Sequence, residues 1–252
     1  MSDWSANQYN RFQQERSQPA YDLMDMIGPR NNMRIMDLGC GTGELTKTLH
    51  ERFRSIDTIG IDTSADMLAK APRAPNLRFF EADISEFRGD SEYDLIFSNA
   101  ALHWVPGHEE LFARIHKAVR PGGQIAIQIP KNSEHPSHRV AFDLEKEPPY
   151  NQYPPCPTAK NTLAPEAYAA LLHRLGFKAI KVRLFVYLHE LASGSETIEW
   201  LKGSLLNHYK SSQPAEVYSL FEKEFHNRIE RSIGQEKPYL FTFNRILMHA
   251  VR

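Results

Sequence analysis

The feature that most constrains the fold is a glycine triplet that directly follows an apolar segment. Residues 33–38 are largely apolar, and three glycines then occupy alternate positions from 39 to 43. A helical pattern follows at once, with Leu45, Leu49 and Phe53 on one face. Strand, tight loop and helix in this order indicate the first unit of an α/β sheet, because glycine lets the chain turn sharply and lets a ligand approach the backbone.

The spacing of the glycines indicates the class of ligand. A dinucleotide loop reads G-x-G-x-x-G and directs a helix at a pyrophosphate, whereas this loop reads G-x-G-x-G. Asp37 lies two positions before the first glycine, where a carboxylate repels phosphate and attracts a cation. S-adenosylmethionine carries an ammonium and a sulfonium and no phosphate, so we expect it to contact Asp37, Gly39, Gly41 and Gly43. The alternative is a tight strand-to-helix turn that binds no ligand.

Polar residues end the next three predicted strands, which cover residues 57–61, 77–84 and 93–99. Asp62 and Asp83 close the first two, and Asn99 closes the third. Because such ends line the ligand crevice of an α/β sheet, we expect Asp62 to accept the ribose hydroxyls and Asp83 an adenine amine. Either aspartate could instead be an ordinary strand-end or helix-capping residue. With Asn99, the residues Met67 and Ile84 complete the predicted cofactor-binding set.

The segment that follows the central strand carries candidates for the reacting centre. His103 could act as a general base or as an orienting donor, and the alternative is a loop histidine held by the backbone. Trp104 is expected to form a wall of the site. A long strand-like run, Gln124 to Ile129, then leads into Pro130 after the helix-stopping turn at residues 120–123.

Three further segments are predicted to cover the site. Residues 1–28 are read as an N-terminal helical lid in which Tyr9, Arg11 and Arg16 face a substrate anion, although a solvated helix face explains the same residues. Residues 131–163 are rich in proline and are read as a long loop over the site. Residues 190–236 are read as two helices, Glu196 to Lys210 and Ala215 to Arg231, inserted before the last strand, Tyr239 to Val251, and thus as a substrate cap.

Length and composition limit the remaining possibilities. A chain of 252 residues fits one domain of ordinary size with an appended subdomain, and a net charge of −1 argues against nucleic acid as a partner. Cys40 and Cys156 cannot form a disulfide framework. The apolar runs are too short to span a bilayer, for which about 20 residues are needed. We expect a cytoplasmic protein without a metal site that is a monomer or a weak oligomer.

These motifs resemble the class I S-adenosylmethionine-dependent methyltransferases over about residues 33–129. The resemblance rests on the segment from Asp37 to Gly43, on Asp62, on Asp83-Ile84, on Asn99 and on the turn at residues 120–123. It implies a doubly wound, mostly parallel, Rossmann-like sheet of seven strands whose last strand runs antiparallel.

Within that class the chain is most similar to the trans-aconitate 2-methyltransferase family. The similar segments include Glu15-Arg16, residues 97–104, residues 128–130, Trp200-Leu201-Lys202-Gly203 and Phe243-Asn244-Arg245. The resemblance implies methyl-ester formation on a small di- or tricarboxylic acid, with trans-aconitate as the leading candidate. One departure is that Asn207 and His208 stand where the family has an arginine and a proline, and an asparagine cannot replace the charge with which arginine clamps a carboxylate.

A carboxylate acceptor sets modest chemical demands. Its reference pKa of about 4 means that it is already ionised, so the protein must align and desolvate it and need not remove a proton. Tyr9, Arg16 and His103 are the predicted acceptor-positioning residues, and the wider substrate-binding set adds Arg11, Trp104, Lys131 and Arg245. Two alternatives stay open: a methyltransferase for a carrier-bound or more apolar acid, with a cap through Leu205, Leu206 and Tyr209, and a non-catalytic module that binds S-adenosylmethionine.

Overall fold

A computed structural model describes residues 17–202 and 204–252. The predicted lid residues Tyr9, Arg11 and Arg16 therefore lie outside the described residues. The described chain divides into two compact units. The sheet unit comprises residues 17–130, Lys160–Phe185 and Arg245–Arg252, and the helical unit comprises Lys131–Ala159 and Val186–Asn244.

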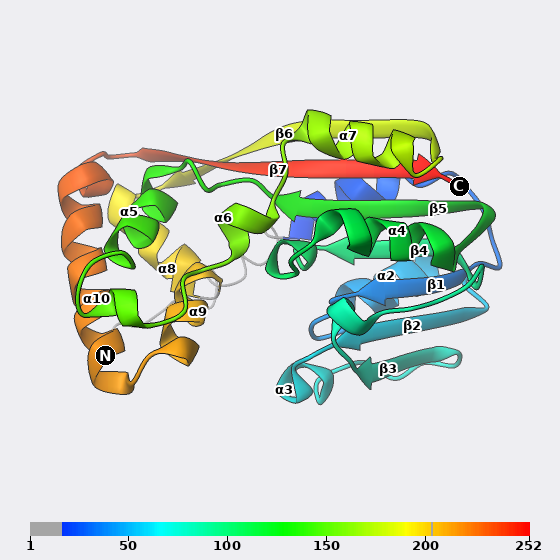
Figure 1. The fold of residues 1–252 in the computed structure, drawn as a ribbon, viewed down its shortest axis with the longest axis horizontal. Helices are drawn as coiled ribbons and strands as arrows, with labels where there is room; N and C mark the ends of the chain where they lie inside the picture. Colours follow the sequence, from blue (N-terminus) through cyan, green and yellow to red (C-terminus); the bar gives the residue numbers. More distant parts are fainter. Residues whose placement is uncertain (1–16, 203) are drawn as a thin grey trace. The chain divides into compact units, whose positions relative to one another are not determined.

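The strands alternate with helices along the first half of the chain, as the glycine loop predicts (Figure 1). The described strands are β1 (Arg34–Leu38), β2 (Asp57–Asp62), β3 (Leu77–Glu81), β4 (Tyr93–Asn99), β5 (Val119–Pro130), β6 (Lys178–Leu191) and β7 (Tyr239–Val251). They form one sheet of seven strands in the order β3-β2-β1-β4-β5-β7-β6.

The sheet is parallel from β3 to β5, and β7 runs antiparallel to β5. This confirms the class I methyltransferase fold, including the antiparallel last strand. The chain moves outward from β1 to β3 and then returns to the other side of β1 with β4. Such a reversal opens a crevice at the carboxyl ends of the strands, where ligands bind in open α/β sheets.

The helices follow the predicted periodicity in most places, and residues 17–25 are also helical. They are α2 (Glu44–Arg52), α3 (Ala65–Leu68), α4 (His108–Ala118), α5 (Pro136–Leu144), α6 (Thr158–Asn161), α7 (Pro165–Arg174), α8 (Thr197–Lys202), α9 (Leu205–Ser212) and α10 (Ala215–Ile229). Short 3₁₀ turns follow β3 (Ile84–Glu86) and β4 (Leu102–Trp104).

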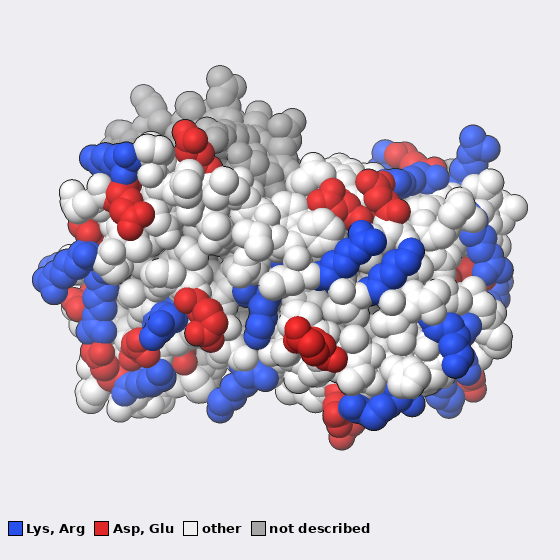
Figure 2. All heavy atoms as spheres, turned by 90° about the horizontal axis from the view of Figure 1, so that it is seen from above, with Lys and Arg blue, Asp and Glu red and all other residues white. Residues whose placement is uncertain are grey.

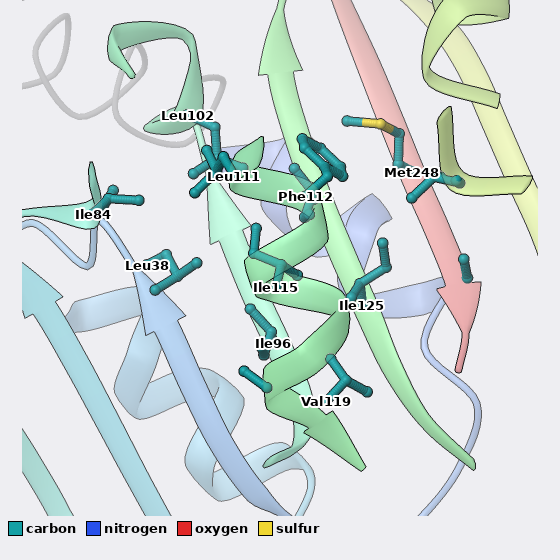
Figure 3. Close-up of a cluster of buried hydrophobic side chains, with 14 of the residues drawn as sticks. Leu38, Ile84, Ile96, Leu102, Leu111, Phe112, Ile115, Val119, Ile125 and Met248 are labelled. Atoms are coloured by element: carbon teal, nitrogen blue, oxygen red, sulfur yellow. The ribbon is translucent and has the colours of Figure 1, made fainter. Parts of the chain in front are cut away.

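Apolar side chains cover both faces of the sheet in the sheet unit. On one face, Leu111, Phe112 and Ile115 of α4 pack over strand residues such as Ile96 and Ile125 (Figure 3). The opposite face buries the segment 17–27 and α2 against the other side chains of the same strands: Ile35, Leu95, Phe97, Ala126 and Leu247. Strands buried on both faces need near-continuous apolar sequence, which is why the pattern predicted them.

The helical unit has a core of its own. It brings apolar residues of α5, α8, α9 and α10 together with Leu191, Tyr239, Phe241 and Phe243. Leu205, Leu206 and Tyr209 are at most 4% exposed within this core. The side chains on which a more apolar cap would depend are therefore used for packing inside the helical unit.

Several boundaries differ from the sequence prediction. Strand β3 ends at Glu81, so the strand predicted over 77–84 is three residues too long, and Asp83 caps the following 3₁₀ turn instead of closing the strand. Residues 131–163 contain a nine-residue helix, α5, which starts with Pro136 at its first turn and buries Ala141 and Leu144. The surrounding prolines indicate a loop and obscure the helical spacing of these buried residues in the sequence. Strand β5 begins at Val119, so the glycine turn predicted at 120–123 lies inside the strand. The single helix predicted over 196–210 is two helices, α8 and α9.

Among the described residues drawn in Figure 2, basic and acidic side chains are interspersed. None of the helices in the described part of the chain is long and apolar enough to cross a membrane.

Candidate active site

The glycine loop adopts a conformation that other residues rarely take. Gly39, Gly41 and Gly43 all have positive φ angles, of 81°, 56° and 75°. A Cβ atom on Gly39 would lie 2.2 Å from the Cβ of Ala101, so this position is closed to larger residues. A Cβ on Gly41 would meet nothing within 4 Å. The loop is therefore packed at Gly39 and open at Gly41, where a ligand can approach the backbone.

Asp62 ties the loop to the end of β2. One carboxylate oxygen, Oδ2, accepts the backbone N–H of Gly41 at 2.9 Å, and Oδ1 accepts the N–H of Ser64 at 2.9 Å. A carboxylate has about four acceptor positions, so Asp62 can still accept two hydroxyl groups. The side chain is half-buried. The structure thus shows Asp62 as a turn residue, and its acceptance of ribose hydroxyls stays a prediction.

Asp37 is the buried anion of the site. Its side chain is 2% exposed, and Oδ2 accepts the hydroxyl of Thr46 at 2.6 Å. Burial raises the pKa of Asp37 to about 7, and the nearby charge of Asp62 raises it further, whereas the Thr46 hydrogen bond opposes the shift. A cation placed beside Asp37 would favour its ionised form. Thr46 is a site residue that sequence analysis did not single out.

The residues predicted around an adenine lie at the ends of β2 and β3. Asp83 is exposed and accepts the N–H of Ser85 through Oδ1 at 2.7 Å. Met67 is 43% exposed on α3, whereas Ile84 is 8% exposed and belongs to the core of the sheet unit. Any ligand contact of Ile84 is therefore confined to a small part of its surface.

Two amide side chains at the ends of β4 and β5 lack hydrogen-bond partners. Asn99 Oδ1 and both polar atoms of Gln128, Oε1 and Nε2, are buried and have no partner among the described residues. An unpartnered buried group costs about 1–3 kcal/mol, so such groups persist mainly where a ligand or water completes them. Ala100, the next residue after Asn99, has a positive φ of 54°, which is strained for a residue other than glycine.

His103 and Trp104 lie in the turn that follows β4. His103 is 9% exposed and Trp104 is 36% exposed, and their ring centroids are 5.0 Å apart. The backbone carbonyl of His103 accepts the amide of Asn161 at 3.1 Å. The turn is thereby tied to α6 in the sheet unit, and Trp104 keeps a solvent-accessible face.

The remaining predicted residues are distributed over both units. Arg245 is buried in the sheet unit, where β7 pairs it with Pro130. Lys131 is half-buried in the helical unit, and its N–H donates to the carbonyl of Asn244. Asn207 is exposed on α9, also in the helical unit. The sheet unit alone thus brings together the glycine loop, Asp62, Asp83, Asn99 and His103.

No group of three or more His, Cys, Asp or Glu side chains within residues 17–202 and 204–252 is arranged to hold a metal ion. The one cysteine of the loop, Cys40, is buried, and burial followed by the charges of Asp37 and Asp62 raises the pKa of its thiol. Cys40 therefore stays protonated near neutral pH.

Residues 35–123 match a family model described as a methyltransferase domain. Curated relatives match over nearly the whole chain. The chain is 39% identical to a trans-aconitate 2-methyltransferase of Deinococcus radiodurans, covering 99% of this chain and 98% of the relative. It is 35% identical to a protein of the same name from Variovorax paradoxus, with 99% and 98% coverage.

Solved structures share the fold at lower identity. The Bacillus subtilis protein YcgJ superposes with a TM-score of 0.65 at 15% identity, covering 93% of this chain and 98% of that one. A Haemonchus contortus phosphoethanolamine N-methyltransferase, solved with phosphomonomethylethanolamine and S-adenosylhomocysteine, gives a TM-score of 0.57 at 17% identity over 93% of this chain and 52% of its own.

Proposed function

The chain belongs to the trans-aconitate 2-methyltransferase family of S-adenosylmethionine-dependent methyltransferases, and we propose that it transfers a methyl group to a carboxylate oxygen of trans-aconitate. The observation that carries this proposal is the extent of the similarity. It includes the segments outside the cofactor-binding half, which in a methyltransferase select the acceptor. In these segments the residues that resemble the family include Trp200-Leu201-Lys202-Gly203 and Phe243-Asn244-Arg245, whereas Asn207 and His208 depart from its pattern.

The residues of the site fit S-adenosylmethionine. Asp37 offers a buried carboxylate to a cation, Asp62 has free acceptor positions for a diol, and Gly41 leaves its backbone accessible. Asn99 Oδ1 is a buried acceptor that has no hydrogen-bond partner among the described side chains and backbone, and it suits an ammonium group. We infer that Asp37, Gly39, Gly41, Gly43 and Asn99 hold the amino-acid end of the cofactor. Asp62, Met67, Asp83 and Ile84 are assigned to its adenosine end.

When bound, S-adenosylmethionine supplies an electrophilic methyl group on its sulfonium. The protein's own residues then align an oxygen of the acceptor and keep water away from it. A carboxylate is already ionised, so none of the residues has to remove a proton. Correct alignment alone can lower the barrier by about 7–11 kcal/mol in favourable cases.

We assign acceptor positioning to His103 and Trp104 in the sheet unit, together with Arg245. Tyr9, Arg11 and Arg16 are proposed partners outside the described residues, and Lys131 is a proposed partner from the helical unit. Segments 131–163 and 190–236 remain the predicted cover of the substrate.

We further infer that the protein acts in the cytoplasm as a monomer or weak oligomer and has no nucleic-acid partner. The net charge of −1 and the absence of a free surface cysteine among the described residues support this inference. Light scattering on the purified protein tests the oligomeric state.

The proposal is tested with S-adenosylmethionine carrying a labelled methyl group and a panel of small carboxylic acids that includes trans-aconitate, citrate and succinate. We expect base-labile label on trans-aconitate, as a methyl ester requires. If only a monocarboxylic or carrier-bound acid is labelled, the reaction class holds and the substrate assignment is wrong. If the cofactor binds and no acid is labelled, the chain acts as a binding module or on another class of acceptor.

A further inference from the structure

Strand β5 contains two glutamines on the same face, and they differ in one respect. Gln124 is satisfied within the protein: its Oε1 accepts the N–H of Gly28 at 2.8 Å and lies 2.8 Å from Nε2 of His249. Gln128, four residues later, is fully buried, yet neither Oε1 nor Nε2 has a partner among the described residues. Every other residue from 125 to 129 is apolar. Within the described part of the chain, Gln124 thus has a structural role and the Gln128 amide has no hydrogen-bond partner.

Gln128 stands beside Asn99. The two residues are in register on the adjacent parallel strands β4 and β5. The preceding pair on the same face, Phe97 and Ala126, lies in the core against α2 and residues 17–27. Side chains alternate along a strand, so Asn99 and Gln128 project on that same side, one step nearer the carboxyl end. Three orphaned amide atoms therefore meet at the edge of the sheet where ligands bind.

The order of the strands separates the roles of the two amides. Asp83 follows β3, Asp62 ends β2, Asp37 is the penultimate residue of β1, and Asn99 ends β4. These residues carry the proposed cofactor contacts, from the adenine to the amino-acid end. β5 is the next strand in the sheet, and at about 4.8 Å per strand its end lies about 19 Å from that of β3. Gln128 thus lies beyond the reactive end of the cofactor, on the side from which an acceptor must approach.

We propose that Gln128 is an acceptor-binding residue whose Nε2 group donates a hydrogen bond to the carboxylate that receives the methyl group. This inference rests on the proposed function. A neutral amide suits the role for a chemical reason. It fixes the orientation of the carboxylate but withdraws less charge from the attacking oxygen than a guanidinium would. The cation and the orienting donor can then act on different carboxylates of the same polyacid.

The test compares Gln128→Met with Gln124→Met, because the two positions share a strand and a face. Calorimetry measures the Kd of S-adenosylhomocysteine and then the Kd of trans-aconitate for the complex. Chemical unfolding measures stability. For Gln128→Met we expect a 10- to 100-fold weaker trans-aconitate affinity, a cofactor affinity within twofold of wild type, and an unchanged or higher unfolding midpoint. For Gln124→Met we expect a lower unfolding midpoint with both affinities kept.

Gln128→Glu provides a second variant of nearly the same shape. It replaces the donor by a second carboxylate, so trans-aconitate binding should weaken further than in Gln128→Met at neutral pH. If Gln128→Met binds trans-aconitate as wild type does, the inference is wrong. If it loses cofactor and acceptor affinity equally, the amide belongs to the cofactor site, and if it loses stability as Gln124→Met does, its role is structural.

The wild-type protein separates failure of this inference from failure of the proposed function. If wild type with S-adenosylhomocysteine binds trans-aconitate, or another acid of the panel, the affinities of the variants are compared for that acid. The result then tests only the assignment of Gln128. If wild type binds S-adenosylhomocysteine and no carboxylic acid, the proposed function fails, and the assignment of Gln128 fails with it.

Discussion

The two ends of the strand pair β4 and β5 treat buried polar side chains in opposite ways. At the amino end, Asp94 accepts the N–H of Arg34 at 2.8 Å and pairs with Arg120 at 3.2 Å, and Gln124 is bound by Gly28. At the carboxyl end, Asn99 Oδ1 and both amide atoms of Gln128 have no partners among the described residues.

Burial does not explain this difference, because Asp94, Gln124 and Gln128 are all at most 7% exposed. What differs is the source of the partner. At the amino end the chain supplies it, and the polar group holds a loop or terminus to the sheet. At the carboxyl end residues 17–202 and 204–252 supply none, which is the expected arrangement where a ligand completes the hydrogen bonds. Within one pair of strands, the buried polar groups that have protein partners thus support the fold, and those without described partners indicate where a ligand binds.

Asp62→Ala is expected to have the largest effect. It tests the rule that polar groups at carboxyl strand ends serve ligand binding, because Asp62 lies at the carboxyl end of β2 and yet has protein partners. The variant would lose the two hydrogen bonds that the Asp62 carboxylate is proposed to accept from the ribose hydroxyls. At about 1.5–3 kcal/mol each, their loss predicts at least a 100-fold weaker cofactor affinity, measured by calorimetry. Asp57→Ala, at the amino end of the same strand, is the control. Asp57 makes an exposed ion pair with Arg78, so the cofactor affinity should not change. An unchanged affinity in Asp62→Ala would remove Asp62 from the site.

Asp94→Ala and Asn99→Ala sharpen the comparison within β4. Removal of the Asp94 carboxylate leaves the N–H of Arg34 without its acceptor, and we expect the free energy of unfolding to fall by about 2–3 kcal/mol with cofactor affinity kept. Asn99→Ala removes an acceptor without a partner, so stability should hold while cofactor affinity falls about five- to tenfold. Urea unfolding and calorimetry on both variants check this. Equal stability losses in the two variants would contradict the division between the ends.

Asp37 predicts a pH dependence of cofactor binding. Its pKa of about 7 means that the free protein gains a proton there as the pH falls, whereas a cationic ligand requires the carboxylate. Affinity should therefore rise about tenfold from pH 5.5 to 7.0, a range in which the cofactor's α-amine stays charged. Calorimetry in two buffers of different ionisation enthalpy measures the released proton. Asp37→Asn should bind more weakly and lose this dependence, and the same slope in that variant would assign it to other groups.

The same pKa shift affects folding with the opposite sign. Between about pH 4 and pH 7 the folded chain holds the Asp37 proton that the unfolded chain has released, so stability falls as the pH rises through this interval. Urea unfolding at about pH 4 and about pH 7 measures this effect: the free energy of unfolding of Asp37→Asn should change less between the two pH values than that of wild type.

His103→Ala should give the smallest effect, a decrease of less than about tenfold in kcat, because a carboxylate acceptor needs no base. His108→Ala is the control. His108 is held by Tyr168 and by the carbonyl of Leu102, so its loss should lower stability and spare kcat. A collapse of kcat in His103→Ala that recovers at high pH would instead identify a general base and a different acceptor.

Periodicity and glycine spacing predict the alternating strands and helices of the first half of the chain, whereas the seven-stranded sheet with its antiparallel last strand is implied only by the resemblance to class I methyltransferases. The sequence predicts strand β7 with the bounds that the structure shows, Tyr239–Val251. The pattern failed where two signals compete in a short segment. Around Pro136, the prolines that mark a loop also stand at the first turn of a helix, so α5 was read as loop.

The candidate site was predictable only where chemistry and position coincide in the sequence. Asp62 and Asp83 could be found because an acid directly follows an apolar run. Thr46 and Gln128 could not be found in that way, because their importance depends on neighbours from other elements: Asp37 for Thr46, and Asn99 for Gln128. The available signal for Gln128 was a polar residue inside a strand that should be buried on both faces.

The strand that completes the sheet is the last one to be synthesised. β7 lies between β5 and β6, and its residues 245–251 make the pairing with β5. Until the ribosome has released these residues, β5 and β6 both present an unpaired edge, and such an edge is a template for pairing with another chain. The nascent protein is therefore most prone to aggregation while residues 186–244 are being translated, and the pace of translation over that stretch should affect the yield of folded enzyme.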